Sequence, residues 1–357
     1  MVLPLNIKKV GSHYEMATFL KVSGEIQEYR GKKPETGEDT IANYNPGSNP
    51  VHRRLKTGYF VAFREKIPVG RIAAIKDFLN PDSKTGLFGC FECRDDAGAA
   101  SSLVEAARKW LIENGCPRMI GPATFNTNQK VGMLVEGYEY GPQPMLPYNP
   151  PYYNRLMELS GLVKHTDLLT FVWNSDMGIP ERVRLAAAKV RRTKDVKLRK
   201  FNLMDIPYEA HLIRDLFNGS MSANWGFTPL TLDESAGMLH YCRNFADRDL
   251  MATVWLQGKP VGLLLFLPIG SPGPTSPTSI RAAILGVLPQ YRHRGLDLYI
   301  IEHMMKTVIS KGYRDADLSL IHEENAVVLK FVTRAVGALL SRRFRVYGNT
   351  PPEMAGH

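Results

Sequence analysis

Two stretches of this 357-residue sequence show the same order of predicted elements, and this repetition constrains the fold more than any other feature. In the first half, an apolar strand at Leu87 to Cys93 precedes a helix from about Ala97 to Asn114 and a short strand at Arg118 to Ile120. Gly115 follows the helix, where a left-handed residue commonly ends one. The pattern predicts a strand, helix, strand unit of a mixed α/β protein.

The second half repeats this order. A strand at Ile280 to Val287 enters a basic turn, a helix spans Leu296 to Lys311, and a strand follows at Ala316 to Ile321. Apolar residues recur every four positions in this helix and predict one buried stripe: Leu296, Ile300, Met304 and Val308. We infer that the chain contains two copies of one α/β architecture, each with a mixed sheet.

The length permits two domains, because single domains usually contain about 50 to 250 residues. We expect the first copy in residues 1–175, a polar linker in residues 176–195 and the second copy in residues 196–350.

The turn of the second copy is predicted to bind an anion. Gly295 lies between a strand and the first turn of a helix, so backbone N–H groups without helical partners and the helix dipole point to the same place. Arg292 and Arg294 add positive charge there. The first copy has Asp95 and Asp96 at the equivalent helix start, which would cap the helix and repel a phosphate. We therefore expect the first copy to be degenerate and without donor binding.

The segment from Val287 to Asp297 resembles the acyl-coenzyme A signature of the GNAT acyltransferase superfamily, in its expected strand, turn, helix context. Glu324-Asn325 before a helix resembles the second motif of that superfamily. The elements at Tyr148 to Tyr153 and Lys164 to Leu169 resemble sequence elements of tandem GNAT-like bacterial proteins. The resemblance implies an N-acyltransferase that uses acetyl-CoA or another acyl-CoA as co-substrate, with donor-binding residues Val287, Arg292, His293, Arg294, Gly295, Leu296, Asp297 and Asn325.

Asp297 departs from the superfamily pattern, which has a small residue at this position. A carboxylate in the first turn suits the helix dipole but would repel phosphate if it pointed into the site. Either it faces outward as a helix-start residue, or the donor is bound in an unusual way.

The usual catalytic groups of the superfamily are missing from their expected positions. The strand at Ile280 to Val287 holds no acid, and Phe331 lies about where the superfamily usually has a tyrosine acid. The candidates are His322 and Glu324, at the end of the second strand, and Tyr347 near the C-terminus. Such a pair of imidazole and carboxylate can act as acid and base. Helix capping would equally explain Glu324, and His322 could be a surface residue.

Several polar and aromatic residues are candidates for contact with an acceptor substrate. They lie in the Pro- and Asn-rich segment of the first half or in an aromatic loop of the second: Asn126, Asn128, Glu136, Tyr148, Trp225 and Phe227. A structural loop in the first half, and core aromatic residues in the second, are the alternatives.

Composition restricts the partners. The net charge of +10 and pI near 9.3 favour an acidic partner such as coenzyme A or an acyl carrier protein. Nucleic acid is not expected, since no recognised motif accompanies the charge. No apolar run reaches the roughly 20 residues of a transmembrane helix, so we expect no integral membrane segment and a cytoplasmic location. No metal, nicotinamide or flavin signature is present.

Three functions agree with these observations. The first is transfer of an acyl group, most simply acetyl, from acyl-CoA to the amine of a small molecule. The second is transfer of a long acyl chain from acyl carrier protein to an amine. The third is a non-catalytic ligand-binding protein on a GNAT scaffold, since the usual base and tyrosine are missing. A shared fold does not itself choose among them.

Overall fold

The computed structural model describes residues 4–29, 40–143, 145–193, 195–245, 247–269 and 279–349, and the chain divides into two units. Unit 1 consists of Met1–Tyr138, Met145–Asp167 and Phe344–His357, and unit 2 of Glu139–Pro144 and Leu168–Arg343. Each unit therefore includes a segment from the other half of the sequence. We describe the two units separately.

The sheet of unit 1 is mixed. Its strand order is β1-β2-β3-β4-β5-β13, and β6 also pairs with β13. Only β4 and β5 are parallel among the pairs whose register is defined, and β13 closes the sheet through Tyr347 opposite Gly121. The strands span Leu5–Lys9 (β1), Leu55–Arg64 (β2), Ile67–Asp77 (β3), Thr85–Cys93 (β4), Arg118–Gly121 (β5), Met133–Glu136 (β6) and Leu339–Gly348 (β13).

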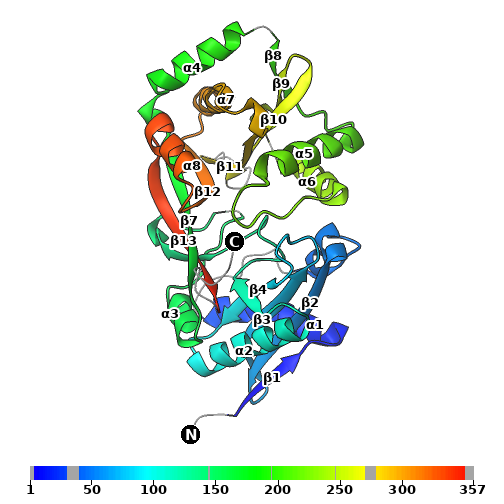
Figure 1. Cartoon of the computed structure of the whole chain (residues 1–357). Helices are drawn as coiled ribbons and strands as arrows, with labels where there is room; N and C mark the ends of the chain where they lie inside the picture. Colours follow the sequence, from blue (N-terminus) through cyan, green and yellow to red (C-terminus); the bar gives the residue numbers. More distant parts are fainter. Residues whose placement is uncertain are drawn as a thin grey trace. The chain divides into compact units, whose positions relative to one another are not determined.

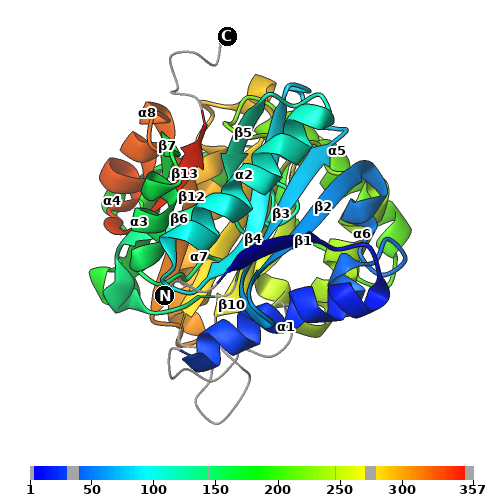
Figure 2. The ribbon, with the colours of Figure 1, turned by 90° about the horizontal axis from the view of Figure 1, so that it is seen from below.

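Helix α2 (Ala97–Glu113) packs along β2 and β3, as Figure 2 shows. Its buried Leu103, Ala107 and Trp110 recur at helical spacing and form one apolar face. The contact is close, because a Cβ on Gly58 of β2 would lie 2.8 Å from the Trp110 ring. The other helices of this unit are α1 (His13–Tyr29) and α3 (Tyr152–Leu159).

The sheet of unit 2 has the order β13-β7-β12-β11-β10-β9-β8. Here β11 and β12 are parallel, whereas β7 runs antiparallel to β12. The new strands span Val163–Asn174 (β7), Val196–Lys200 (β8), Met251–Leu256 (β9), Lys259–Ile269 (β10), Ser279–Val287 (β11) and Asp315–His322 (β12).

Helix α7 (Leu296–Ser310) covers one face of this sheet, and α5 (Ile206–Met221) and α6 (Leu232–Phe245) cover the other (Figure 1). The predicted stripe of α7 is confirmed, since its four residues are at most 3% exposed. Residues 176–195, expected as a linker, contain α4 (Glu181–Arg192), whose Val183 and Val190 join the same core. The remaining helical segments are α8 (Ala326–Lys330), the π-helix η7 (Phe331–Val336) and the 3-10 turns η1 (Ile41–Tyr44), η2 (Pro50–Arg54), η3 (Tyr138–Tyr140), η4 (Ser175–Met177), η5 (Arg248–Leu250) and η6 (Pro289–Tyr291).

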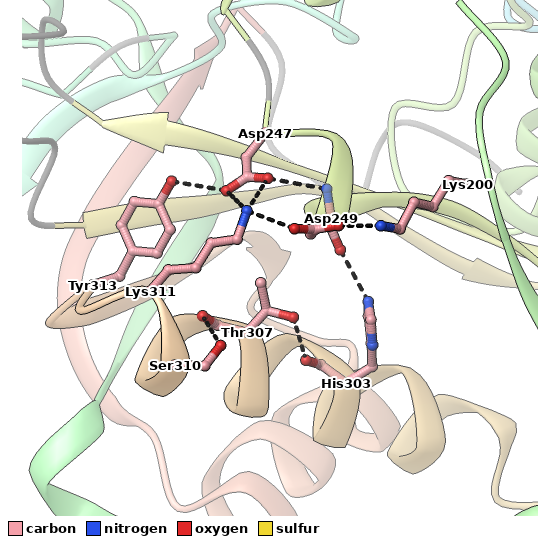
Figure 3. A network of polar contacts seen from close by, with 8 residues as sticks. All are labelled: Lys200, Asp247, Asp249, His303, Thr307, Ser310, Lys311 and Tyr313. Carbon is pink, nitrogen blue, oxygen red and sulfur yellow. Dashed lines mark hydrogen bonds and ion pairs between the residues drawn. The ribbon is translucent and has the colours of Figure 1, made fainter.

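A network of charged side chains joins the end of α7 to the connection between α6 and β9 (Figure 3). Lys311 contacts Asp247 at 2.6 Å and Asp249 at 2.7 Å, and Lys200 of β8 also pairs with Asp249. The hydrogen bonds from these two lysines lower the pKa of Asp249 to about 2. The network therefore links three segments of unit 2 through ion pairs.

None of the helices that the structure describes is both long enough and apolar enough to cross a membrane.

Candidate functional site

The parallel strands β11 and β12 part before they end. Their pairing runs from Ser279 opposite Asp315 to Ala282 opposite Leu318, whereas the strands continue to Val287 and His322. We call Ala283–Val287 and Ser319–His322 the parted strand ends.

Two β-bulges explain the parting. Against β10, Leu265 pairs with Ile284 and Phe266 with Ala282, so Ala283 is an extra residue in β11. Against β7, β12 has a second register shift between Leu318 and Ile321. A bulge bends its strand and increases the local twist. Both strands are therefore redirected at the same level of the sheet, just after their last shared pair.

The turn between β11 and α7 exposes backbone donors. His293 and Gly295 have positive φ angles of 61° and 76°, and Gly295 is the N-cap residue of α7. Glycine brings no side chain to cap the helix, so no N-cap side chain accepts the N–H groups of the first turn. The Arg294 guanidinium is exposed and lies over the Tyr291 ring at 5.4 Å. This arrangement fits the predicted anion site, to which the dipole of α7 contributes.

Arg292 is committed to backbone contacts. Its Nε donates to the Val287 carbonyl at 3.1 Å, and its Nη2 donates to the Ser220 carbonyl at 2.7 Å. The guanidinium thus ties the turn to the ends of β11 and α5. Its charge remains near the turn, but these two donors hold protein carbonyls.

Two further residues that were predicted to bind the acyl donor, Asp297 and Asn325, act as helix-start residues. The Asp297 carboxylate accepts the N–H of Leu298 at 2.9 Å, and the Asn325 side chain accepts the N–H of Val328 at 3.1 Å. Asp297 therefore occupies one amide of the first turn of α7 and places negative charge beside the others. Asp297 was expected either to be a helix-start residue or to accompany an unusual mode of donor binding. The structure shows the helix-start contact.

His322 and Trp225 come together in unit 2. Their rings stack with centroids 5.5 Å apart and an interplanar angle of 6°. Burial lowers the pKa of His322, against the opposing charges of Glu324 and Glu323. The imidazole is therefore mainly neutral at pH 7 and able to accept a proton. Phe227, from the same loop as Trp225, stacks with Phe217 at 6.3 Å.

Tyr347 lies in unit 1, whereas His322 and Glu324 lie in unit 2, so the three catalytic candidates are not assembled within one unit. The Tyr347 side chain is 1% exposed, and its hydroxyl donates to Asn154 at 3.0 Å. Burial raises the pKa of Tyr347 to about 12. These contacts are those of a core tyrosine.

The candidate acceptor residues are also divided between the units. Asn126, Asn128, Glu136 and Tyr148 belong to unit 1, and only Trp225 and Phe227 of this set belong to unit 2. The Asn126 side chain is 1% exposed and accepts the N–H of Asn128 at 3.0 Å. The Tyr148 hydroxyl donates to the Tyr138 carbonyl at 3.2 Å. Glu136 is exposed.

Sequence reasoning missed a buried group of charges in unit 2, formed by Arg281, Asp317 and Arg342. The available signal was a charged residue in the interior of each of three strands. Among the described residues, no three His, Cys, Asp or Glu side chains lie so that they could hold a metal ion.

No protein-family model matches the chain. Two curated proteins are similar over most of their length. The bacterial ceramide synthase of Caulobacter vibrioides (strain NA1000 / CB15N) is 26% identical over 333 residues, which cover 85% of this chain and 86% of the relative. Protein YghO of Escherichia coli (strain K12) is 27% identical over 332 residues, which cover 85% of this chain and 83% of the relative.

Solved structures with similar folds include several GNAT proteins. A tandem GNAT protein from the clavulanic acid biosynthesis pathway has a TM-score of 0.57 at 11% identity, with coverage of 97% of this chain and 98% of that protein. A GCN5-related N-acetyltransferase from Sphaerobacter thermophilus has a TM-score of 0.53 at 14% identity, with coverage of 97% and 96%. The glucosamine N-acetyltransferase region of a fungal multi-domain enzyme has a TM-score of 0.60 at 12% identity, and this chain spans 38% of that longer protein. The chain therefore has the fold of two GNAT units in tandem, and the resemblance predicted from its sequence is confirmed at the level of the fold.

Proposed function

We propose that this protein is an N-acyltransferase that moves an acyl group from a thioester donor to the amine of a long-chain amino alcohol. The observation that carries the proposal is the parting of β11 and β12 beside the glycine-capped start of α7. The name of the Caulobacter relative supports the acceptor class, because a ceramide is the N-acyl derivative of a long-chain amino alcohol.

The donor is an acyl-CoA in this proposal. Backbone groups of the parted strand ends hydrogen-bond the pantetheine arm, as a neighbouring strand would. The first-turn amides of α7 and the Arg294 side chain bind the diphosphate. Acyl carrier protein presents the same arm, and the net charge of +10 also suits that acidic protein.

Amide formation requires a neutral amine at the thioester carbonyl. His322 takes one proton from the nitrogen, directly or through a water, as the C–N bond forms. The C–S bond then breaks, and the thiolate takes up one proton from the charged imidazole or from water. The products are one amide and one free thiol. Tyr347 has no part in this scheme, because its hydroxyl is bonded within the core of unit 1.

A mass-spectrometric assay tests the function directly. The purified chain is mixed with a long-chain amino alcohol and a series of donors, from acetyl-CoA to long-chain acyl-CoA and acyl carrier protein thioesters. We expect saturable amide formation with at least one long-chain donor. If amide formed only from acetyl-CoA, a long acyl chain would be rejected as the group that the enzyme transfers. A complete absence of amide with every donor would reject the transferase and leave the ligand-binding scaffold.

The role of His322 is tested through pH. With the wild type, kcat/KM should rise as pH increases through a midpoint below 6.5, the ordinary value for this group, because the neutral imidazole is the active form. His322→Gln should lower kcat by about 100-fold, the usual contribution of a general base, and remove this dependence. His303→Gln is the matched control, because that ring contacts the Asp249 carbonyl in the network of Figure 3.

Glu324→Gln refines the same test. The negative charge of Glu324 raises the pKa of His322, so its removal should move the midpoint of the pH profile further below that of the wild type. A midpoint that stays in place, or moves to higher pH, would show that His322 is not the titrating group.

A further inference from the structure

Three ionisable side chains from three strands of unit 2 are buried together. Arg281 of β11 is 8% exposed, Asp317 of β12 is 2% exposed and Arg342 of β13 is 3% exposed. Arg281 and Asp317 are direct partners in the last part of the parallel ladder, one residue before it ends. Charged groups are rarely buried unless they are paired, so this cluster calls for a complete account of its contacts.

Most of the polar atoms in the cluster have partners. Arg281 Nε donates to the Ser319 hydroxyl at 2.9 Å, and Arg342 Nη1 donates to Asp317 Oδ2 at 3.1 Å. Arg342 Nη2 donates to the Tyr140 carbonyl at 3.0 Å, and the same guanidinium lies over the Tyr140 ring at 5.1 Å. The segment around Tyr140 thus contacts Arg342 within unit 2.

Asp317 Oδ1 is the cluster's carboxylate oxygen without such a contact. This oxygen is buried and has no hydrogen-bond partner among the described residues. Burial also raises the pKa of Asp317, although a hydrogen bond of its carboxyl group with Ser319 and the charges of the two arginines act in the opposite direction. A carboxylate oxygen buried without a donor is costly, so such atoms in native proteins usually bind water, an ion or a ligand.

The oxygen belongs to the same face of the sheet as the proposed base. Ala316 and Leu318 of β12 lie in the core beneath α7, so Asp317 between them points to the opposite face. Ile321 also lies in that core, which directs His322 to the face of Asp317. Asp317 therefore precedes the parted strand ends on the side where His322 and Trp225 stack.

We propose that Asp317 is a specificity-determining residue, whose Oδ1 accepts a hydrogen bond from a hydroxyl group of the amino-alcohol acceptor. The proposal rests on the proposed function and identifies the hydroxyl group as the part of the acceptor that this site recognises. An ionised carboxylate only accepts hydrogen bonds, so it selects a donor and rejects an anion. A hydroxyl satisfies it and leaves the amine nitrogen free to attack the thioester.

The test compares two acceptors of equal chain length, a long-chain 2-amino alcohol and the corresponding amine without a hydroxyl. A site built to bind a hydroxyl discriminates strongly against an analogue that lacks it, so wild-type kcat/KM should favour the amino alcohol by about 100-fold or more. Asp317→Asn keeps the shape and a partner for Arg342 but replaces the charged acceptor. It should reduce the preference to about tenfold or less, with little change for the plain amine.

Ser341→Ala is the matched control. Ser341 is also a buried polar residue of β13, but its hydroxyl bonds with Thr170 at 2.8 Å, outside the charged cluster. Its preference for the amino alcohol should equal that of the wild type. A circular-dichroism melt of each variant shows whether it is folded before its preference is interpreted.

Binding of both acceptors without donor, measured by calorimetry, separates the two proposals. Preferential binding of the amino alcohol without turnover would support Asp317 and reject the transferase. Turnover of both acceptors with equal efficiency by the wild type would overturn the role of Asp317 and keep the transferase, even if the variant fails to fold. Binding of neither acceptor would reject both. If kcat/KM fell equally for both acceptors in a folded Asp317→Asn variant, Asp317 would have a structural role only.

Discussion

The two units share a fold but differ where their parallel strands part. In unit 1, the pairing of β4 and β5 also stops early, at Leu87 opposite Ile120. There the Ala123 N–H donates to the Phe88 carbonyl at 2.8 Å, so the chain itself fills the opening. In unit 2, no backbone hydrogen bond among the described residues joins the segment after β12 to β11 beyond Ala282. The first unit is closed by its own backbone, and the second is not.

The helix starts differ in the same sense. Asp96 caps α2 by accepting the N–H of Ala99 at 3.0 Å, and Arg64 pairs with it at 2.9 Å. The hydrogen bond from Arg64 is the main cause that lowers the pKa of Asp96. Gly295 offers no such group to α7. One fold thus gives a sealed structural unit or a candidate binding unit, depending on one returning segment and one capping side chain.

The largest effect is expected from a substitution next to Ala123, whose backbone closes the opening between β4 and β5 in unit 1. A Cβ at Gly89 would lie 1.8 Å from the Ala123 carbonyl oxygen, which is backbone and cannot rotate away. Gly89→Ala should therefore destabilise unit 1 by about 3 kcal/mol, the upper part of the range for overpacking. Hydrogen exchange of β4 and β5 measures this locally.

Gly286→Ala is the counterpart in unit 2. Its Cβ would meet the side chains of Ser220 and Met221, at 2.3 and 2.9 Å, and side chains can shift. We expect a loss of about 1 kcal/mol from this milder overpacking. Equal losses in the two units would mean that unit 1 is not sealed more rigidly than unit 2.

The next largest effect is expected when a capping aspartate, like Asp96 in unit 1, is introduced at the start of α7 in unit 2. Gly295→Asp should weaken acyl-CoA binding by about 100-fold, because a carboxylate near the phosphates is strongly repelled at these distances. Equilibrium titration with acyl-CoA measures it. Gly295→Asn is the control for the strain of a left-handed side chain, since Asn tolerates that conformation without charge, and it should retain most of the affinity.

The third prediction concerns Asp297, whose carboxylate lies in the first turn of α7. Asp297→Asn removes the charge, so acyl-CoA should bind about fivefold more tightly, as expected for one charge beside a helix start. The gain should shrink at high salt, because exposed charges are screened. Unchanged affinity would place the diphosphate away from the start of α7.

The smallest effect is expected from the network of Figure 3. The pKa of Asp249 is lowered from 3.8 to about 2, so its contribution to stability is present above 3.8 and is lost as pH falls toward 2. Because these side chains are partly exposed, Asp249→Asn should cost only about 0.5 kcal/mol at pH 7. Hydrogen exchange of α7 should show the difference from wild type disappear in acid, and a difference that persists would contradict the linkage.

Local features were predictable from the sequence. The strand, helix, strand order and the buried stripe of α7 depend on residues close together in the chain, and the structure has both. The degenerate first copy was expected from Asp96, but its seal by Ala123 was not, because a backbone contact leaves no pattern of residue types.

Long-range features were not predictable. The assignment of Tyr347 depended on which sheet receives β13, and only the structure shows it opposite Gly121. Asp317 looked like an isolated charge in a short strand, because Arg342, its partner, is 25 positions further along the chain. The candidate Asn126 is similar, since its burial depends on how the whole loop of unit 1 folds.

The last strand has a consequence for biosynthesis. Unit 1 needs Phe344 to Gly348 to complete its sheet, so translation must pass residue 348 before this unit has all its strands. Domains usually fold in order as they leave the ribosome. Here unit 1 cannot be completed until Phe344 to Gly348 have been synthesised, and a chain that lacks these residues exposes an unfinished sheet edge that is open to aggregation.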